Sequence, residues 1–369
     1  MTIVSFVIVA YNAEKYLDYS LKSLASQIYP HEYIEVIFVD GLSNDMTKQR
    51  MIEFKSLHSD FRRIEIFDNP GRYLACGWNV ALKECTGDVI LRVDAHTLFP
   101  DDFITQNVNI IKKGECICGG KVLSILQKDT EWNRTLLAAE NSMFGGGFTF
   151  FRRGETEKYT NTLAFASYKK DVFDTVGTYN EKLVRTEDNE MHYRMRKAGY
   201  RFFFYPNIVS YRFNRSSLKG LLKQKFLNGY WVGLTHAIEP MAFSVFYLVP
   251  LFLFLSIVLF LLISYWTPIP FITLSILYIL ILLLSLLGAI KARGLHYTLI
   301  ALPFIIFGLH IAYGVGTAKG LCEEDYKMSS SRLSALYNKI PRGVRFVYWL
   351  VEIILLPFKS IIWALKLLI

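Results

Sequence analysis

The longest uncharged stretch of the sequence limits what this chain can fold into. Between Pro240 and Ile290 there is no Asp, Glu, Lys or Arg, whereas charged residues occur throughout Met1–Glu239. A chain of 369 residues can hold a domain of roughly two hundred residues and a second part of different character. We therefore predict a water-exposed N-terminal domain followed by a part that lies in lipid.

Apolar segments of the C-terminal part are long enough to cross a hydrocarbon core of about 30 Å. Phe243–Ser264 and Phe271–Ala289 are firm candidates, and Thr298–Val315 is a third, which contains His310 and could be bent or re-entrant. Phe346–Ile369 is apolar but interrupted by charged residues and a proline, so it could lie in the interface as readily as span it. We expect about three crossings, within a range of two to four.

The placement of positive charge predicts membrane lipids as a partner. The net charge is +9, and basic residues gather just before the apolar stretch and again at Lys291 and Arg293. Charges next to spans mark the cytoplasmic side and attract anionic headgroups. There is no basic stripe interleaved with aromatic residues, as single-stranded nucleic acid requires, so we expect no nucleic-acid partner. The first cluster consists of Arg212, Arg215, Lys219, Lys223 and Lys225.

The same charge bias bears on the third segment. If Thr298–Val315 crosses fully, the basic stretch Lys327–Arg345 lies outside, against the bias. A re-entrant segment would remove the conflict. Met1–Tyr11 has neither the basic region nor the cleavage site of a signal peptide. We therefore expect a multi-pass protein of the cell (inner or plasma) membrane with its N-terminal domain in the cytosol.

The N-terminal part alternates between two patterns. Apolar runs predict strands, and segments with helical spacing lie between them. Such alternation predicts an α/β fold with a mostly parallel sheet. The predicted strands are Val4–Val9, Ile34–Val39, Arg63–Asp68 and Asp88–Val93, and the predicted helices are Ala13–Gln27, Asn44–Leu57 and Leu74–Cys85.

Ligands of such sheets bind beyond the carboxyl ends of the strands, where Asp40 and the triplet Asp94-Ala95-His96 stand. Asp94 and His96 can both reach one divalent ion, and Mn²⁺ accepts a mixed oxygen and imidazole shell where Mg²⁺ prefers oxygen. Asp40 can accept a hydrogen bond from a nucleobase imide. Turn formation explains Asp40, and a chance loop carboxylate explains Asp94, without any function.

Acidic residues gather in Thr186–Glu190, which holds three carboxylates. Crowding raises at least one pKa, and a carboxylate with a raised pKa suits a general base. The same residues could form an acidic first turn of a helix capped by Thr186, and the two interpretations are compatible. No Gly-x-Gly-x-x-Gly or Walker loop follows a strand, which argues against a dinucleotide dehydrogenase and a P-loop NTPase.

These motifs, in this order, resemble the family-two inverting glycosyltransferases with a GT-A fold. Asn69–Arg72 through Val93–His96, and later His310–Gly316, are most similar to the bacterial succinoglycan-type exopolysaccharide enzymes. The resemblance implies a GT-A catalytic domain over residues 1–210. An amphipathic interfacial segment over 211–238 and a membrane domain over 239–369 would follow.

The resemblance also implies a role for each motif. Asp188 would be the catalytic base with Glu187 beside it, and Asp94 and His96 would hold Mn²⁺ or Mg²⁺. Gln224 and Trp231 would contact acceptor or donor sugar, although they lack the arginine and the spacing of the corresponding motif in processive synthases. An interfacial anchor explains Trp231 as well. The nucleotide-sugar-binding positions would be Ala10, Tyr11, Asn12, Glu14, Asp40, Arg72 and Asp94, with Tyr11 and Asp40 on the base, usually uracil.

The implied reaction is transfer of a single sugar, with inversion, from a UDP-sugar to a lipid-linked or glycan acceptor. A polyprenyl-linked acceptor in exopolysaccharide or other cell-surface glycan synthesis is the favoured case. Two other enzymes stay open, a polyprenyl-phosphate sugar synthase and a processive polysaccharide synthase. Outside enzymes, the chain could be a catalytically silent membrane scaffold, against which the clustered acidic residues count. The sequence leaves the oligomeric state open.

Overall fold

A computed structural model describes residues 1–142, 145, 150–152 and 154–323, and in it the chain forms two compact units. The first unit consists of Met1–Ser217 and Ala289–Ile300. The second consists of Leu218–Gly288 and continues from Ala301. The apolar segment predicted at Phe346–Ile369 and the basic stretch before it lie outside the described residues.

The first unit begins with strands and helices in strict alternation, as predicted. Its first four strands lie in the order β3-β2-β1-β4, and all of these pairings are parallel. The elements are β1 (Val4–Ala10), α1 (Glu14–Ala25), β2 (Ile34–Asp40), α2 (Thr47–Leu57), β3 (Arg63–Asp68), α3 (Leu74–Glu84) and β4 (Val89–Asp94). β1 and β2 are buried at every position, which explains their uninterrupted apolar runs.

The rest of the sheet is mixed, because β6 pairs parallel with β9 whereas β8, β5 and β7 run antiparallel to their neighbours. The order continues β4-β8-β6-β9-β5, with β7 beside β9. The short β8 runs antiparallel to both of its neighbours. The α/β class is confirmed. The elements are β5 (Thr97–Leu98), α4 (Phe103–Lys112), β6 (Ile117–Ile125), α5 (Glu131–Asn141), β7 (Lys158–Thr160), β8 (Ser167–Lys169), α6 (Lys170–Val176), α7 (Glu187–Lys197) and β9 (Phe202–Phe213).

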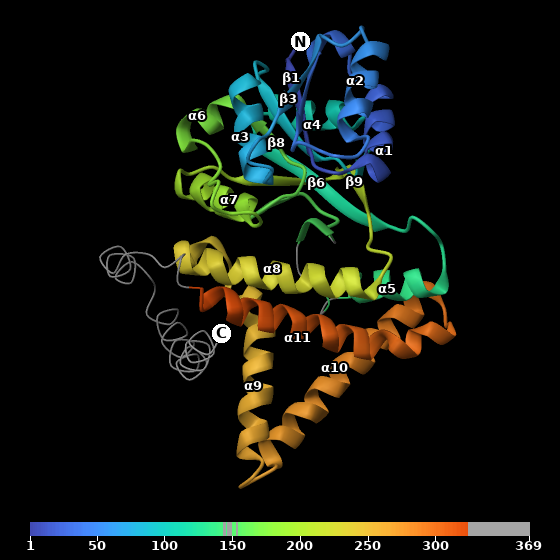
Figure 1. Cartoon of the computed structure of the whole chain (residues 1–369), viewed down its shortest axis with the longest axis vertical. Helices are drawn as coiled ribbons and strands as arrows, with labels where there is room; N and C mark the ends of the chain where they lie inside the picture. Colours follow the sequence, from blue (N-terminus) through green and yellow to red (C-terminus); the bar gives the residue numbers. More distant parts are fainter. Residues whose placement is uncertain (143–144, 146–149, 153, 324–369) are drawn as a thin grey trace, which may run out of the picture. The chain divides into compact units, whose positions relative to one another are not determined.

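Helices cover both faces of this sheet (Figure 1). Alternate residues of β1 point to opposite sides, so Phe6 joins a core that includes α1, α2 and α4, while Val7 joins one that includes α3 and α7. Trp78 of α3 and Tyr168 of β8 are among the largest buried side chains of the second core. The sheet is therefore held rigidly from both sides, and its carboxyl edge is a fixed platform.

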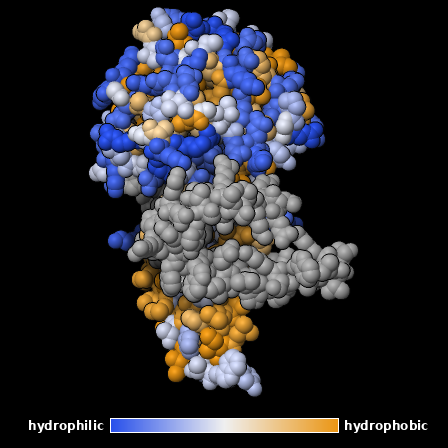
Figure 2. Space-filling view, turned by 90° about the vertical axis from the view of Figure 1, so that its left-hand side faces the viewer, coloured by the Kyte–Doolittle hydropathy of each residue, from blue (hydrophilic) through white to orange (hydrophobic). Residues whose placement is uncertain are grey.

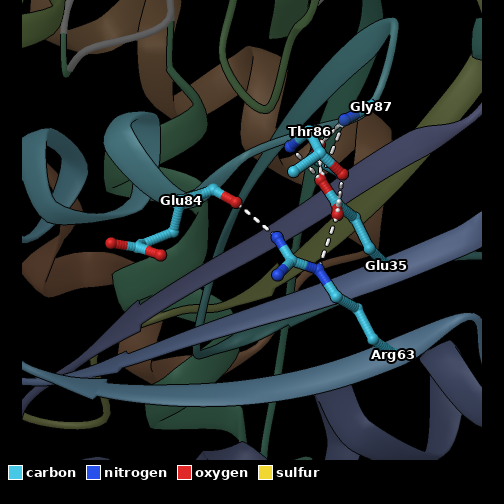
Figure 3. A network of polar contacts seen from close by, with 6 residues as sticks. Glu35, Arg63, Glu84, Thr86 and Gly87 are labelled. Atoms are coloured by element: carbon cyan, nitrogen blue, oxygen red, sulfur yellow. Dashed lines mark hydrogen bonds and ion pairs between the residues drawn. The ribbon is translucent and has the colours of Figure 1, made fainter.

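A buried carboxylate fastens the opposite, amino edge of the parallel strands (Figure 3). Glu35 of β2 is fully buried and accepts hydrogen bonds from the Arg63 Nε at 2.8 Å, the Thr86 Oγ1 at 2.6 Å and the Gly87 N–H at 2.9 Å. The Ser5 hydroxyl of β1 donates to it as well. Residues of β1 and β3 and the segment before β4 thus converge on one side chain of β2.

This network makes the stability of the first unit depend on pH. Burial raises the pKa of Glu35, but the hydrogen bonds from Ser5, Thr86 and Gly87 outweigh it and leave the pKa below its ordinary value. The carboxylate therefore stabilises the fold above the ordinary glutamate pKa, and its contribution is lost as the pH falls through the lowered value.

We expect Glu35→Gln to lower the free energy of unfolding by about 2 kcal/mol at neutral pH, since buried donors lose their acceptor. The difference between the variant and the parent should shrink as the pH falls below the ordinary glutamate pKa and through the lowered value, where folded Glu35 loses its charge. Unfolding of the full chain, followed by thermal denaturation at several pH values, measures both effects. A difference that does not change with pH would contradict the assignment.

The second unit is helical. It contains α8 (Leu218–Ile238), α9 (Val249–Ile263), most of α10 (Ile269–Arg293) and α11 (Leu302–Leu321). Three segments are long and apolar enough to cross a membrane: Phe246–Ile263, Ile269–Arg293 and Tyr297–Leu321. The α9–α10 hairpin presents a mostly hydrophobic outer surface, whereas that of the first unit is mostly hydrophilic (Figure 2).

Candidate active site

The predicted nucleotide-binding residues lie along the carboxyl edge of the four parallel strands. Ala10 of β1 is in register with Asp40 of β2, and Val9 is in register with Asp94 of β4. The loops that follow neighbouring strands therefore begin side by side. The apolar runs of the sequence were sufficient to predict where these strands end.

Asp40 is a buried acceptor with one free oxygen. Its side chain is fully buried, and its Oδ2 accepts from the Ser43 N–H at 3.0 Å. Its Oδ1 is buried and has no hydrogen-bond partner among the described residues. An unpaired buried carboxylate oxygen is costly unless a ligand donates to it. Tyr11 lies close to Gly41, the residue after Asp40, since a Cβ added to Gly41 would be 3.0 Å from the Tyr11 Cβ. The Tyr11 side chain is 47% exposed.

Asn12 and Glu14 are occupied by contacts between two loops. The Asn12 N–H donates to the Ser43 Oγ at 2.9 Å, and its Oδ1 accepts from the Asn44 N–H at 3.0 Å. The Glu14 Oε2 accepts from the Met46 N–H at 2.9 Å. These side chains fasten the loop after β1 to the loop after β2, and so hold Tyr11 and Asp40 together.

Arg72 stands in the loop after β3, at the same edge. It is exposed and has a left-handed backbone with a φ of 59°. Its N–H donates to the carbonyl oxygen of Asn69 at 3.1 Å, and the Asn69 N–H donates to that of Asp40 at 2.7 Å. The exposed guanidinium is therefore carried by a loop that is hydrogen-bonded to the end of β2.

A cavity of about 200 Å³ brings the two acidic motifs together. Asp94, at the end of β4, and Asp188, in the first turn of α7, both line it. The residue patterns predicted each motif separately, and only the resemblance implied that both act on one substrate. The other lining residues are Arg92, Val122, Phe151, Leu163, Ala164, Phe165, Tyr168 and Arg212.

The two neighbouring carboxylates of α7 lie in different environments. Glu187 is 3% exposed, and its Oε1 accepts from the Arg92 Nη2 at 2.8 Å. Asp188 faces the cavity. Burial raises the pKa of Glu187 to about 7, and the charge of Asp188 adds to the effect, although Arg92 acts against it. The arrangement commits Glu187 to an ion pair and leaves Asp188 open to a ligand.

The start of α7 confirms the acidic first turn but corrects the expected cap. Thr186 has a left-handed backbone with a φ of 64°, and its side chain makes no capping hydrogen bond to the helix. A β-branched residue in this conformation stores strain of about 1–3 kcal/mol. This left-handed residue immediately precedes Glu187, which pairs with Arg92, and Asp188, which lines the cavity.

Sequence reasoning missed Arg92, which organises this region. Its guanidinium carbon lies 4.7 Å from the Trp78 ring centroid, and its Nη1 is 3.4 Å from the Tyr179 hydroxyl. Tyr179 precedes α7 and is held by Asn79 of α3, which accepts from its N–H at 2.7 Å and donates to its carbonyl oxygen at 2.9 Å. The sequence did contain a signal for Arg92, because this arginine interrupts the apolar run of β4. It stands two positions before Asp94, and residues i and i+2 of a strand share one face, so both side chains belong to the same face of the sheet.

Arg212 also lines the cavity, although the sequence analysis placed it in a membrane-facing basic cluster. Its guanidinium pairs with the buried Glu140 of α5 and donates to the Ser124 Oγ at 3.2 Å. Arg152 approaches the same carboxylate at 3.5 Å. Arg212 is therefore fixed within the first unit.

Asp94 and His96 are the predicted pair of metal ligands. Burial is the largest cause of a lowered pKa at His96. The positive charges of Arg212 and Arg215 lower the pKa further, whereas the negative charge of Asp94 raises it. The imidazole is therefore neutral at neutral pH, as a metal ligand must be. The described residues contain no group of three or more metal-ligating side chains. Two protein ligands suit an ion whose remaining positions are filled by substrate phosphate and water.

Gln224 and Trp231 belong to α8 in the second unit and remain predicted sugar contacts. The Trp231 ring is 9% exposed and lies edge-on to Tyr230, with ring centroids 5.7 Å apart. The Gln224 Oε1 is buried and unpartnered among the described residues.

Comparison with known proteins identifies the family. The profile "Glycosyl transferase family 2" matches residues 5–177. A dolichyl N-acetyl-alpha-D-glucosaminyl phosphate 3-beta-D-2,3-diacetamido-2,3-dideoxy-beta-D-glucuronosyltransferase of Methanococcus voltae is 31% identical, over 87% of this chain and 98% of that protein. The succinoglycan biosynthesis protein ExoA of Rhizobium meliloti (strain 1021) is 26% identical, over 64% of this chain and 76% of that protein.

Solved structures show the same fold. The mannosyltransferase PcManGT from Pyrobaculum calidifontis, determined with GDP-Man and Mn²⁺, aligns with a TM-score of 0.55 at 16% identity. The alignment covers 86% of this chain and 87% of that one. The first unit therefore has the GT-A fold that its motifs predicted.

Proposed function

Because this chain belongs to glycosyl transferase family 2, we propose that it transfers a single sugar, with inversion, from a UDP-sugar to a lipid-linked acceptor. One observation carries the proposal: Asp94 and Asp188 meet in a cavity beside the carboxyl edge of the sheet. This edge is where α/β sheets bind nucleotides. A substrate bound in this cavity would contact both carboxylates, one from a strand end and one from a helix.

The donor would lie along the edge, with its base at Asp40. The free Asp40 Oδ1 can accept a hydrogen bond from the imide N–H of uracil. Tyr11 offers an exposed ring beside it for stacking. Ala10, Asn12 and Glu14 shape the loop that holds these two, and Arg72 provides a cation near the diphosphate.

Asp94 and His96 would hold a divalent ion, and their mixed oxygen and nitrogen set favours Mn²⁺ over Mg²⁺. When bound, such an ion supplies Lewis-acid stabilisation of a departing diphosphate. The chain's own part is to orient the donor so that its anomeric carbon faces Asp188.

Asp188 would be the general base that takes the proton of an acceptor hydroxyl. It lines the cavity, whereas Glu187 is held by Arg92. The apolar residues Phe151, Leu163 and Phe165 line the same cavity. Attack from the face opposite the leaving diphosphate inverts the anomeric carbon.

The acceptor proposal rests on the Methanococcus voltae relative, which aligns with this chain over 98% of its length. That protein is named for action on a dolichyl N-acetylglucosaminyl phosphate. A sugar already attached to a lipid phosphate offers a hydroxyl nucleophile, which requires a base such as Asp188. The apolar helices would keep the enzyme at the height of such an acceptor in the cell membrane, with the first unit on the cytosolic side. A glycan acceptor in exopolysaccharide synthesis is the related case.

The test is release of UDP by the purified full chain in detergent, with Mn²⁺, a panel of UDP-sugars and lipid extract. We expect metal-dependent release from one donor, stimulated by lipid. Asp94→Ala should lower it about a hundredfold, since a Lewis acid supplies several kcal/mol. Asp129→Ala is the matched control, because Asp129 is exposed and paired with Arg134. Absence of release and of donor binding across the panel would refute a UDP-sugar donor.

A further inference from the structure

Glycines hold α8 and α11 in backbone contact along their length. A Cβ on Gly229 would lie 2.1 Å from the carbonyl oxygen of Tyr313, and one on Gly233 would lie 2.4 Å from that of Thr317. Both helices advance by four residues in the same direction between these contacts, so they are parallel and run side by side (Figure 1). The reciprocal contacts are Gly316 with the Phe226 oxygen at 2.1 Å and Gly320 with the Tyr230 oxygen at 2.0 Å.

The path of the chain limits how often the intervening helices cross the membrane. β9 ends at Phe213 in the first unit, and Ala289–Ile300 belongs to that unit again. There the Thr298 Oγ1 and the Thr135 Oγ1 of α5 share a hydrogen bond of 2.8 Å. Because a folded polar unit lies on one side of a bilayer, the number of crossings between these two points is even.

α9 and α10 are the two helices that cross. Their segments have mean hydropathies of 2.9 and 2.6, and none of the α10 segment is buried within the protein. α8 instead carries the exposed Lys219 and Lys223 one helical turn apart. Lysines in mid-membrane are expensive. An even number of crossings leaves no place for α8 beside α9 and α10, and its lysines are unfavourable in lipid. Both arguments place α8 outside the hydrocarbon.

α11 must share the depth of the helix along which it packs. Its segment is apolar, but 39% of it is buried, against 17% for the α9 segment. Its exposed Phe304 and Phe307 stand one turn apart, as expected of a helix that rests an apolar stripe on the acyl boundary. The partner of this surface is a lipid bilayer.

Charge placement agrees with this arrangement. The turn between α9 and α10, residues 264–268, has no charged residue. If α9 and α10 are the two crossings and α8 and α11 lie at the surface, the basic residues of these helices all lie on the side of the first unit, namely Lys219, Lys223, Lys291, Arg293 and Lys319.

We propose that the chain crosses the membrane twice, through α9 and α10, and that α8 and α11 lie as a parallel pair on the bilayer surface. The pair is on the side that holds the first unit. This topology goes beyond the proposed reaction and does not depend on the donor or the acceptor.

The test is labelling of sealed membrane vesicles of both orientations with a membrane-impermeant maleimide. The full chain carries Thr267→Cys in the α9–α10 turn, and peptide mass mapping separates the thiols. The natural Cys76 and Cys116, partly exposed, report the side of the first unit, and the partly exposed Cys322 reports the end of α11. We expect Cys322 to be labelled in the same vesicles as Cys76 and Cys116, and the Thr267→Cys thiol in the opposite ones.

Two outcomes would overturn the topology. Labelling of Cys322 together with the Thr267→Cys thiol would make α11 a third crossing. Labelling of Cys322 in neither orientation, with reaction only in detergent, would place the end of α11 inside the bilayer.

A second experiment in the same vesicles tests the packing of α8 against α11. Gly316→Leu, whose side chain meets the backbone of α8, should increase labelling of Cys322 several-fold as α11 separates from α8. Gly288→Leu in α10 is the control, since a Cβ there meets nothing within 4 Å. Equal labelling in the two variants would contradict the packing.

Discussion

The Asp188→Asn variant is expected to lose about 10²- to 10⁴-fold in sugar transfer, the range that general base catalysis supplies. The amide keeps the size of the side chain but cannot take a proton from an acceptor hydroxyl. Asp188 lines the cavity with Asp94, and Arg92 forms its ion pair with the neighbouring Glu187 rather than with Asp188, so the substitution should leave the fold and the metal ligands intact. The loss should fall on kcat, with the KM for the donor nearly unchanged.

The measurement is steady-state transfer to a lipid-linked sugar by the full chain, with donor affinity measured separately. Asp171→Asn is the matched control, because Asp171 also stands in the first turn of a helix but is exposed. Retention of more than about a tenth of the parent rate would remove Asp188 from the role of base.

The same variant separates two kinds of acceptor. A lipid phosphate is already ionised at neutral pH and attacks without a base, so a polyprenyl-phosphate sugar synthase would tolerate Asp188→Asn. A sugar hydroxyl would not. Comparison of the two acceptors with one variant therefore decides between the proposed reaction and its main alternative.

The predictable parts of this protein are those that local sequence determines. Strands buried on both faces have uninterrupted apolar runs, so Val4–Ala10 and Ile34–Asp40 were predicted to within a residue. Asp40 and Asp94 then followed from their positions at strand ends. The acidic start of α7 was visible because its carboxylates are adjacent.

What could not be predicted depends on partners distant in sequence. Arg92 and Glu187 are 95 positions apart, and no local pattern pairs them. The antiparallel β8 is three residues long and has too short a pattern to reveal its direction. The pairing of α8 with α11 had a partial signal, since small residues four apart favour close helix contacts but do not name the partner helix.

The Arg92→Met variant should have the largest effect on the fold. Arg92 and Glu187 are 8% and 3% exposed, and removal of one partner of a buried ion pair costs about 3–5 kcal/mol because the other charge is left unpaired. The contact with the Trp78 ring, at 4.7 Å, is lost as well. Thermal unfolding of the full chain should show a clear decrease in the first unit's stability.

A double-mutant cycle shows whether this cost comes from the pair. Glu187→Gln removes the charge that Arg92→Met leaves unpaired, so the double variant should recover most of the lost stability, as neutral replacements of buried pairs often do. Transfer should not recover with it, because the pair also holds the turn that presents Asp188 to the cavity. Additive losses of stability would mean that Arg92 acts through Trp78 and Tyr179 alone. Recovery of both properties would mean that the ion pair does not position Asp188, and that Trp78 and the Asn79–Tyr179 contacts are sufficient to hold α7.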